Sequence, residues 1–274
     1  MRIQSKNLNI LQIADSGQCF RMNKIDNNQY STIAYGSFIL LTQVDEETVD
    51  FSCSEEEFHL IWEEFFDLSY DYNRIVKSLT EGKDEFLNKA AEYGKGIRIL
   101  RQEPFEALIS FIISQNKNIS SIKCCIERIC EKYGETKVSK EGVQFTTFPT
   151  PEQLSLAKKE DLRELKLGYR DDYIIKAAQA VFHGTIDLMN LMKCSHEETV
   201  RTLRIIPGVG DKVANCASLY GLHHIEAFPI DVWIARVLTE VYQNNFDIEK
   251  YQGYAGIVQQ YMFYYMRYLK NNPC

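Results

Sequence analysis

The spacing of apolar residues changes near residue 54 of this 274-residue chain, and that change constrains the fold more than any other feature. Before it, apolar and polar residues alternate, as at Phe20 and Met22 or at Val49 and Phe51, which is the period of a half-buried strand. After it the period is helical, and one apolar stripe comprises Ile119, Ile122, Ile126, Ile129, Cys130 and Tyr133. The sequence therefore predicts an α+β protein, with an N-terminal antiparallel β-sheet followed by a mostly α-helical bundle in two parts.

Segments rich in Gly and Asn divide both regions into shorter elements. Turn-like residues 26–28 and 45–46 separate the expected strands, and helix breaks are expected at residues 94–96, 115–118, 134, 168 and 184. Residues 136–151 are the best candidate for an internal linker. We predict a sheet with covering helices over residues 1–80 and a helical region over residues 81–274.

The composition is that of a soluble globular protein. No apolar run approaches the roughly 20 residues that cross a bilayer, and the first ten residues lack the apolar core of a signal peptide, so a cytoplasmic protein is expected. The cysteines form no CxxC pair and no ligand-like spacing, which argues against a metal site or an iron–sulfur cluster. We expect reduced thiols at Cys19, Cys53, Cys124, Cys125, Cys130, Cys194, Cys216 and Cys274.

The net charge of −7 counts against nucleic-acid binding, because Lys and Arg normally supply most of the nonspecific affinity for phosphates. A chain of this charge can bind DNA if backbone N–H groups and a few local cations contact the phosphates. The acidic residues would then lie on the far side.

The segment LRIIPGVGDKVANCASLYG reads as a helix, a tight hairpin and a second helix that starts at Asp211, over about residues 197–222. Gly208 and Gly210 permit a turn with positive φ, and the turn leaves free N–H groups at the start of the second helix, where an anion such as a DNA phosphate is favoured. By itself the hairpin could equally join two packed helices, or grip DNA in a protein with no catalytic activity.

Lys212, in the first turn of the second helix, and Asp231, within AFPIDVWIARVL, indicate chemistry. Asp231 is a natural N-cap, and capping alone would explain it. Cleavage of a glycosidic bond builds positive charge on the sugar, which a carboxylate stabilises and a neutral amine can attack. The resulting imine would make the neighbouring C–H acidic and so open a route to strand cleavage by β-elimination.

The hairpin, Lys212 and Asp231 together resemble the helix-hairpin-helix DNA glycosylases, and most closely the 8-oxoguanine DNA glycosylase/AP lyases of the shorter prokaryotic branch. The resemblance runs from SGQCFR to YAGIVQQYMF and thus covers almost the whole chain. It implies that Lys212 is the Schiff-base nucleophile and that Asp231 stabilises the sugar cation and orients the lysine. It implies no organic cofactor, and nothing in the spacing demonstrates a metal.

The resemblance also implies a pocket for a base that is flipped out of the duplex. Gly17 would offer its backbone carbonyl to the N7–H that 8-oxoguanine has and guanine lacks, while Cys216 and Phe263 would contact the two faces of the base. Gln259 lies four residues before Phe263 on the last helix and would read the Watson–Crick edge. Taken alone, these residues could be a turn glycine, two core residues and a solvated glutamine.

Other residues match positions that contact DNA in the family. Asn116 would fill the gap left by the flipped nucleotide, and Tyr169 and Arg170 would wedge the stack and hold the opposite cytosine, although helix capping and a surface ion pair are the ordinary alternatives. The chain has Ser121 where eukaryotic members place a second cytosine-reading arginine, and Trp233 where they have a phosphate-contacting histidine. Weaker selectivity for the opposite base is therefore expected.

We thus expect a monomeric, nucleoid-associated enzyme that acts on double-stranded DNA containing 8-oxoguanine. Two alternatives stay open at this point. The same scaffold could excise another damaged base, such as an alkylated purine, because specificity depends on the pocket and not on the hairpin. Alternatively, the chain could be a non-catalytic DNA-binding module in which Lys212 contacts a phosphate.

Overall fold

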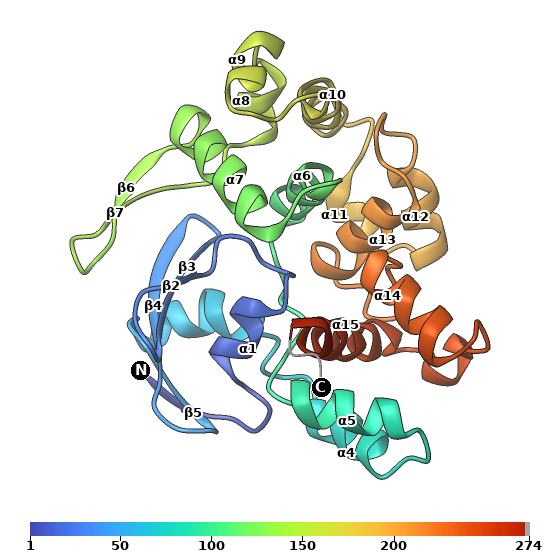
Figure 1. Ribbon diagram of the computed structural model, residues 1–274. Helices are drawn as coiled ribbons and strands as arrows, with labels where there is room; N and C mark the ends of the chain where they lie inside the picture. The colour runs from blue at the N-terminus through green and yellow to red at the C-terminus, as the bar shows by residue number, and fades with distance from the viewer. Residues whose placement is uncertain (272–274) are drawn as a thin grey trace.

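The computed structural model describes residues 1–271, and the N-terminal part is built on a five-stranded antiparallel sheet in the order β1-β5-β4-β3-β2 (Figure 1). Its strands are β1 (Arg2–Gln4), β2 (Asn23–Lys24), β3 (Gln29–Ala34), β4 (Ser37–Gln43) and β5 (Thr48–Phe51). The predicted turns at residues 26–28 and 45–46 connect β2 to β3 and β4 to β5. Alternate residues are buried, and Leu41 pairs with Phe51 on the face that packs into the core.

Two expectations for this region were wrong. Phe20 and Met22 are buried but lie in an irregular segment between α1 (Ile10–Asp15) and β2, not in a strand. Helix α1 was not predicted, because six residues are too few for a helical period to stand out. It forms because the side chain of Asn9 caps the backbone N–H of Gln12, and Ile10 is fully buried beneath the sheet.

The expected linker at residues 136–151 contains a second, two-stranded antiparallel sheet of β6 (Thr136–Val138) and β7 (Gln144–Thr146), which corrects the prediction. Its residues are held by contacts to the first sheet and to the short helix after β5, which sequence periodicity does not reveal. The ring centroids of Phe145 and Phe38 lie 5.7 Å apart, and Lys140 pairs with Glu57 at 2.7 Å. Figure 1 shows this ribbon beside β2 and β3.

The rest of the described chain is helical, as the change in period predicted. The helices are α2 (Glu55–Glu57), the π-helix η1 (Phe58–Trp62), α3 (Glu63–Phe65), α4 (Tyr72–Thr80), α5 (Glu85–Gly94), α6 (Pro104–Ser114), α7 (Ile119–Tyr133), α8 (Pro151–Ser155), α9 (Lys159–Glu164), α10 (Arg170–Phe182), α11 (Leu188–Leu191), α12 (His196–Leu203), α13 (Asp211–Tyr220), α14 (Val232–Arg236), the π-helix η2 (Val237–Val241), the 3-10 helix η3 (Ile248–Tyr251) and α15 (Ala255–Asn271). All the predicted helix breaks fall between helices or at helix ends. The apolar stripe on α7 faces the core, as expected.

Two apolar clusters form the core. The smaller one lies between the sheet and residues such as Phe58, Trp62 and Phe66. The larger one joins α4 and α5 to the helices from α6 to α15. In Figure 1 α11 to α13 lie beside α6, and α15 lies lower, against α5. The division of the chain at residue 80 stays a prediction.

Within residues 1–271, no helix is both long enough and apolar enough to cross a membrane. The cysteines of the described part are free thiols, and Cys274 lies outside it.

Candidate active site

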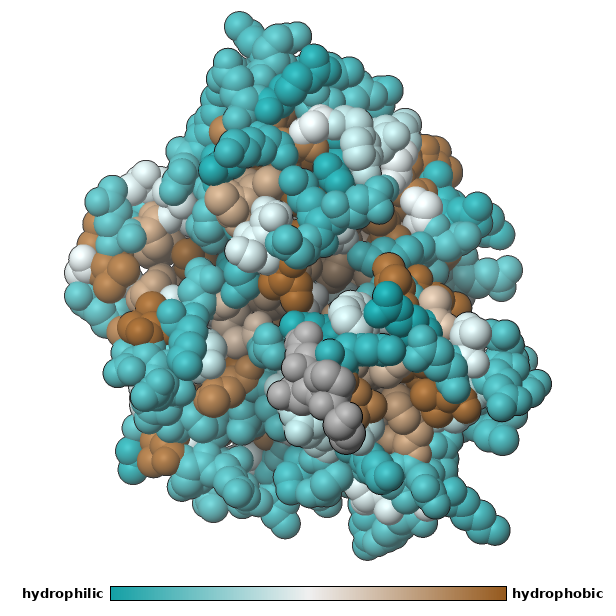
Figure 2. All heavy atoms as spheres, viewed as in Figure 1, coloured by the Kyte–Doolittle hydropathy of each residue, from teal (hydrophilic) through white to brown (hydrophobic). Residues whose placement is uncertain are grey.

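A cavity of about 870 Å³ opens where several segments distant in sequence meet. Its wall includes the loop after α1, the end of α6 with the loop that follows it, α13, the start of α14, and α15. In Figure 1 these segments surround the centre of the molecule, and Figure 2 shows hydrophobic residues gathered near that centre between hydrophilic rims. The volume is within the range of roughly 300 to 1,000 Å³ that proteins use for small-molecule ligands.

Lys212 enters this cavity from the first turn of α13. Its Nζ donates a hydrogen bond to the Oγ of Ser114 at 2.8 Å and lies 5.3 Å from the ring centroid of Phe111. The Ser114 hydroxyl in turn donates to the backbone carbonyl of Phe111 at 2.8 Å, so its oxygen is left to accept from the lysine. The amine is therefore held in one place by the end of α6.

Asp231 lines the same cavity and caps α14, as predicted. Its Oδ1 accepts hydrogen bonds from the backbone N–H groups of Trp233 at 3.0 Å and Ile234 at 2.9 Å. Burial raises the pKa of Asp231 above its usual value, although these two N–H groups and the charge of Lys212 oppose the shift. The cap thus fixes a partly desolvated carboxyl group in the wall that also holds the lysine.

The hairpin between α12 and α13 needs one of its two glycines for its backbone conformation. Gly208 has φ of 83°, and a Cβ there would lie 2.2 Å from Cγ of Tyr173. Gly210 does not have positive φ, which corrects the prediction for it: its φ is −91° and a Cβ would meet nothing within 4 Å. Gly210 is the N-cap of α13, and no side chain caps this end of the helix. The N–H groups of the first turn are thus left for an anion.

The residues predicted to bind the base lie together. Gly17, Cys216, Gln259 and Phe263 all line the cavity. A Cβ at Gly17, where φ is 75°, would come within 3.2 Å of the Phe263 ring, so the glycine packs directly against that ring. Burial raises the pKa of the Cys216 thiol to about 11, which keeps it neutral and suited to contact an aromatic face. The structure thus brings the two expected faces of a base-binding slot into one cavity.

The residues predicted to contact DNA lie at the cavity rim or outside it. Asn116 lines the cavity with φ of 51°, and its Nδ2 donates to the hydroxyl of Tyr169 at 3.2 Å. Tyr169 is half exposed. Arg170 is buried: it stacks on Tyr169, with its Cζ 4.4 Å from the ring centroid, and donates to the backbone carbonyls of Leu167 and Gln115. The surface ion pair considered for Arg170 is not formed in the described structure.

Two known family models match residues 1–252, which include Lys212 and Asp231. Residues 1–108 match the model of the 8-oxoguanine DNA glycosylase N-terminal domain, and residues 109–252 match that of the HhH-GPD superfamily of base excision DNA repair proteins. The chain belongs to the 8-oxoguanine DNA glycosylase family. Its helix-hairpin-helix at α12 and α13 falls within the second match.

Individual relatives of this glycosylase agree with that assignment. An N-glycosylase/DNA lyase of Saccharomyces cerevisiae is 33% identical over 269 residues, which covers 89% of this chain and 70% of the relative. The structure of MBOgg1 in complex with a low-affinity DNA ligand superposes with a TM-score of 0.92 at 36% identity, covering 98% of this chain and 96% of the other.

A further structure, that of the Clostridium acetobutylicum 8-oxoguanine glycosylase/lyase in complex with double-stranded DNA containing cytosine opposite 8-oxoguanine, gives a TM-score of 0.90 at 34% identity. This superposition covers 99% of this chain and 98% of the Clostridium acetobutylicum chain. These matches confirm the predicted family, the α+β fold, the bifunctional glycosylase and lyase, and DNA as the partner.

The glycosylase site also contains residues that the sequence did not single out. Ser114 contacts the nucleophile candidate, and no motif marks it as special. Arg267 lines the cavity, with its guanidinium 5.4 Å from the ring centroid of Phe263 and bonded to the backbone carbonyl of Asp15 at 2.6 Å. Arg267 lies one helical turn after Phe263, and this spacing could have identified it from the sequence. Trp233, compared above with a histidine of eukaryotic members, also lines the cavity.

Proposed function

We propose that this glycosylase flips 8-oxoguanine into the cavity and cleaves its N-glycosidic bond by attack of the Lys212 amine, with Asp231 stabilising the positive charge that develops on the sugar. One observation supports this proposal above the others. The cavity that holds the amine and the carboxyl group is also lined by the residues suited to bind the base, namely Gly17, Cys216, Gln259 and Phe263.

In the first step the neutral Lys212 Nζ forms a bond to C1′, and the C1′–N9 bond breaks, so that its electron pair leaves with the base. The base takes up the proton that Nζ loses on forming this bond. The carboxylate of Asp231 stabilises the positive charge that develops on the sugar during this step. The sugar ring then opens to an imine between C1′ and Nζ. Loss of a proton from C2′ next to this imine expels the 3′ phosphate and so cleaves the strand by β-elimination.

Base recognition in this proposal follows from the cavity wall. The Gly17 carbonyl accepts a hydrogen bond from N7–H of 8-oxoguanine, a proton that guanine lacks. Phe263 stacks on one face of the base, the neutral Cys216 thiol contacts the other, and Gln259 pairs with its Watson–Crick edge. A guanine in the same place would set its N7 lone pair against the carbonyl oxygen, which is repulsive.

The DNA would be held mainly by neutral groups, which reconciles binding with the net charge of −7. The free N–H groups at the start of α13, beside Gly208 and Gly210, bind a phosphate, while Asn116 and Tyr169 occupy the space that the flipped nucleotide leaves. To contact the base opposite the lesion, Arg170 must first break its hydrogen bonds to the backbone carbonyls of Leu167 and Gln115. We propose a monomer that works on the chromosome, in the nucleoid region of the cytoplasm.

A panel of duplex oligonucleotides tests the substrate. The purified protein is expected to excise 8-oxoguanine and to nick that strand, and to leave 3-methyladenine, 7-methylguanine and undamaged guanine intact, because only 8-oxoguanine offers an N7–H to the Gly17 carbonyl. Single-turnover excision on each duplex, resolved on denaturing gels with and without alkali, measures this. Faster excision of a methylated purine than of 8-oxoguanine would contradict the assignment.

Selectivity for the opposite base is expected to be weak. Arg170 is the one arginine positioned to read cytosine, since Ser121 stands where eukaryotic members have the other, and Arg170 must first leave its buried contacts. Loss of one bidentate base contact corresponds to about 1–3 kcal/mol of discrimination. The one contact that remains is worth the same, or about 5- to 150-fold, and the cost of breaking the buried hydrogen bonds of Arg170 reduces it. Rates of excision with cytosine and with adenine opposite 8-oxoguanine should therefore differ by roughly tenfold or less. Strict dependence on cytosine would show that another residue reads this base.

A further inference from the structure

Residues 16–18 form a strap across one wall of the cavity, outside any helix or strand. Gly17 is at its centre, and neither its N–H nor its carbonyl forms a hydrogen bond to another described residue. The carbonyl is therefore available to a ligand. A glycine carbonyl can discriminate between two bases only if its direction is fixed, and glycine is the residue whose backbone is least restricted by its own structure. The groups on either side must supply that restriction.

Gln260 holds the peptide bond that precedes Gly17. This glutamine is on α15, is only 1% exposed, and donates from Nε2 to the backbone carbonyl of Ser16 at 2.7 Å. Its Oε1 accepts a hydrogen bond from the hydroxyl of Tyr220. Burial raises the pKa of Tyr220 well above its usual value, so this hydroxyl stays a donor at all working pH values. The Ser16 carbonyl can only accept a hydrogen bond, so the Gln260 amide is oriented with its nitrogen toward the strap.

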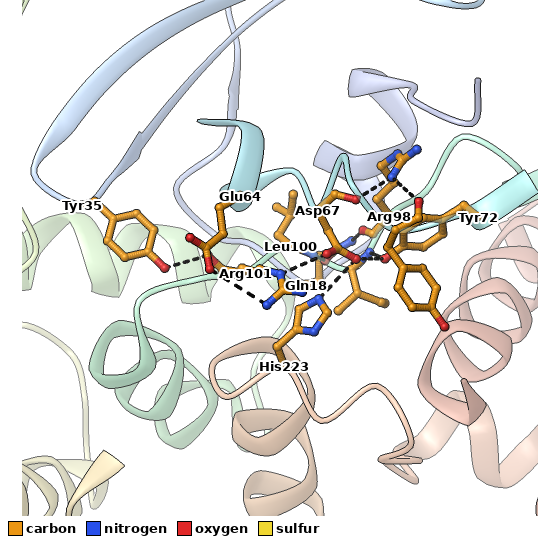
Figure 3. Close-up of polar contacts among 11 residues, drawn as sticks. Gln18, Tyr35, Glu64, Asp67, Tyr72, Arg98, Leu100, Arg101 and His223 are labelled. Atoms are coloured by element: carbon orange, nitrogen blue, oxygen red, sulfur yellow. Dashed lines mark hydrogen bonds and ion pairs between the residues drawn. The ribbon is translucent and has the colours of Figure 1, made fainter. Parts of the chain in front are cut away.

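Gln18 holds the other side of the strap. This side chain is fully buried, and its Oε1 accepts a hydrogen bond from the backbone N–H of Leu100 at 2.8 Å. Its Nε2 donates to the backbone carbonyl of Arg98 at 2.8 Å and to Ser16 Oγ at 2.9 Å. Its own backbone carbonyl accepts from Nε2 of Gln102 at 2.8 Å. Figure 3 shows Gln18 beside Leu100 and Arg98, in a network that continues to other buried polar groups. The residues on both sides of Gly17 are thus fixed by buried glutamines.

We propose that Gln260 is a positioning residue that determines specificity for 8-oxoguanine, because its hydrogen bond to Ser16 sets the direction of the Gly17 carbonyl. This inference rests on the proposed function, in which Gly17 reads the N7–H of the lesion. Gln260 is not among the residues that line the cavity, so it acts through the strap and not by touching the base. Of the two sides of the strap, this one depends on a single side-chain donor from a residue 244 positions away.

Gln260→Glu tests the donor with almost no change in volume. The glutamate keeps an acceptor for Tyr220 but, when ionised, sets an oxygen against the Ser16 carbonyl; when protonated, it donates again. Burial raises the pKa of such a carboxyl group. At pH 8 we expect the single-turnover rate of 8-oxoguanine excision to be roughly 10- to 100-fold lower than that of the wild type. As the pH is lowered to about 6, the rate of the variant should approach that of the wild type measured at the same pH. Gln260→Leu should lose activity equally at both pH values.

Two controls separate this role from a general structural one. Cleavage of a duplex with a preformed abasic site requires Lys212 but no base recognition, so Gln260→Glu should cleave it within a few-fold of the wild-type rate at both pH values. Gln43→Glu is the matched variant: this buried glutamine of β4 donates to the carbonyl of Asp45 at 2.7 Å and accepts from the N–H of Ile10 at 2.8 Å, away from the cavity. It should leave the ratio of excision to abasic cleavage unchanged.

The outcomes distinguish this inference from the proposed function. A wild-type protein that cleaves abasic DNA but does not excise 8-oxoguanine would contradict the function itself. If the wild type excises 8-oxoguanine, three results would each overturn the role of Gln260. Gln260→Glu could excise 8-oxoguanine at the wild-type rate at pH 8, it could lose abasic cleavage to the same extent as excision, or it could lose excision equally at both pH values. Selective loss of excision that is restored at lower pH is the result we expect.

Discussion

Lys212→Gln is expected to abolish the protein–DNA adduct that borohydride traps on 8-oxoguanine DNA and to slow excision by roughly 10³-fold or more. The reason is that the reduced adduct is the imine between Nζ and C1′, which cannot form without the amine. Ser114 and Phe111 hold this amine in the cavity beside Asp231, and glutamine fills nearly the same space. The measurement is a denaturing gel of labelled duplex after borohydride treatment, with single-turnover excision on the same substrate.

Lys117→Gln is the matched control for this experiment. Lys117 lines the same cavity, but its Nζ donates to the backbone carbonyl of Lys166 at 3.2 Å, and loss of this amine should leave the adduct in place at saturating enzyme. An adduct that persists in Lys212→Gln would assign the attack to a different amine. Excision by the wild type without any adduct would indicate attack by water.

The residues that carry local signals could be predicted from the sequence. Asp231 precedes a helical apolar pattern, and the structure shows it capping α14. Lys212 lies in the first turn of the helix that follows the Pro-Gly-Val-Gly turn. The helix breaks and the change from sheet to helices depend in the same way on nearest neighbours, so they too were predicted correctly. Such features are fixed by backbone hydrogen bonds within a few residues.

Features that depend on tertiary contacts could not be predicted. The β6–β7 ribbon has no alternating apolar pattern and is held in place by Phe38 and Glu57. The bond between Gln260 and Ser16 joins residues near opposite ends of the chain, and no spacing in the sequence points to it. The buried position of Arg170 likewise depends on carbonyls of two separate loops. Sequence patterns thus pointed to the residues proposed for the site, while the contacts that support them depend on the fold.

The largest effect on stability is expected from Asp67→Ala. The Asp67 side chain is fully buried in the loop before α4 and accepts hydrogen bonds from Tyr72 Oη at 2.9 Å and Arg101 Nε at 2.9 Å, with Nε2 of His223 at 3.3 Å (Figure 3). Tyr72 begins α4, Arg101 lies in the segment that supports Gln18, and His223 follows α13, the helix that carries Lys212. Removal of one member of such a buried charged cluster costs about 3–5 kcal/mol, because the remaining charges lose their counterion.

For a chain of this size that loss corresponds to a decrease in Tm of roughly 10 °C. Asp171→Ala is the control: Asp171 is equally buried, but its Arg163 partner at 2.9 Å is mostly exposed and can be solvated when the carboxylate is removed. We expect a clearly smaller decrease for it. Thermal unfolding followed by circular dichroism compares the three proteins, and equal decreases in Tm would contradict the special role of Asp67.

The pH dependence of the difference in Tm between the wild type and Asp67→Ala provides an independent check. Burial raises the pKa of Asp67, but the hydrogen bonds and charges of His223 and Arg101 outweigh burial and hold the pKa below its usual value. A carboxyl group with a lowered pKa contributes stability that is complete above its unfolded pKa of about 3.9 and is lost as the pH falls through the folded value. The gap in Tm between the wild type and Asp67→Ala should therefore be present at about pH 5 and narrow below about pH 4. A gap that stays constant at lower pH would mean that the carboxylate charge does not stabilise this cluster.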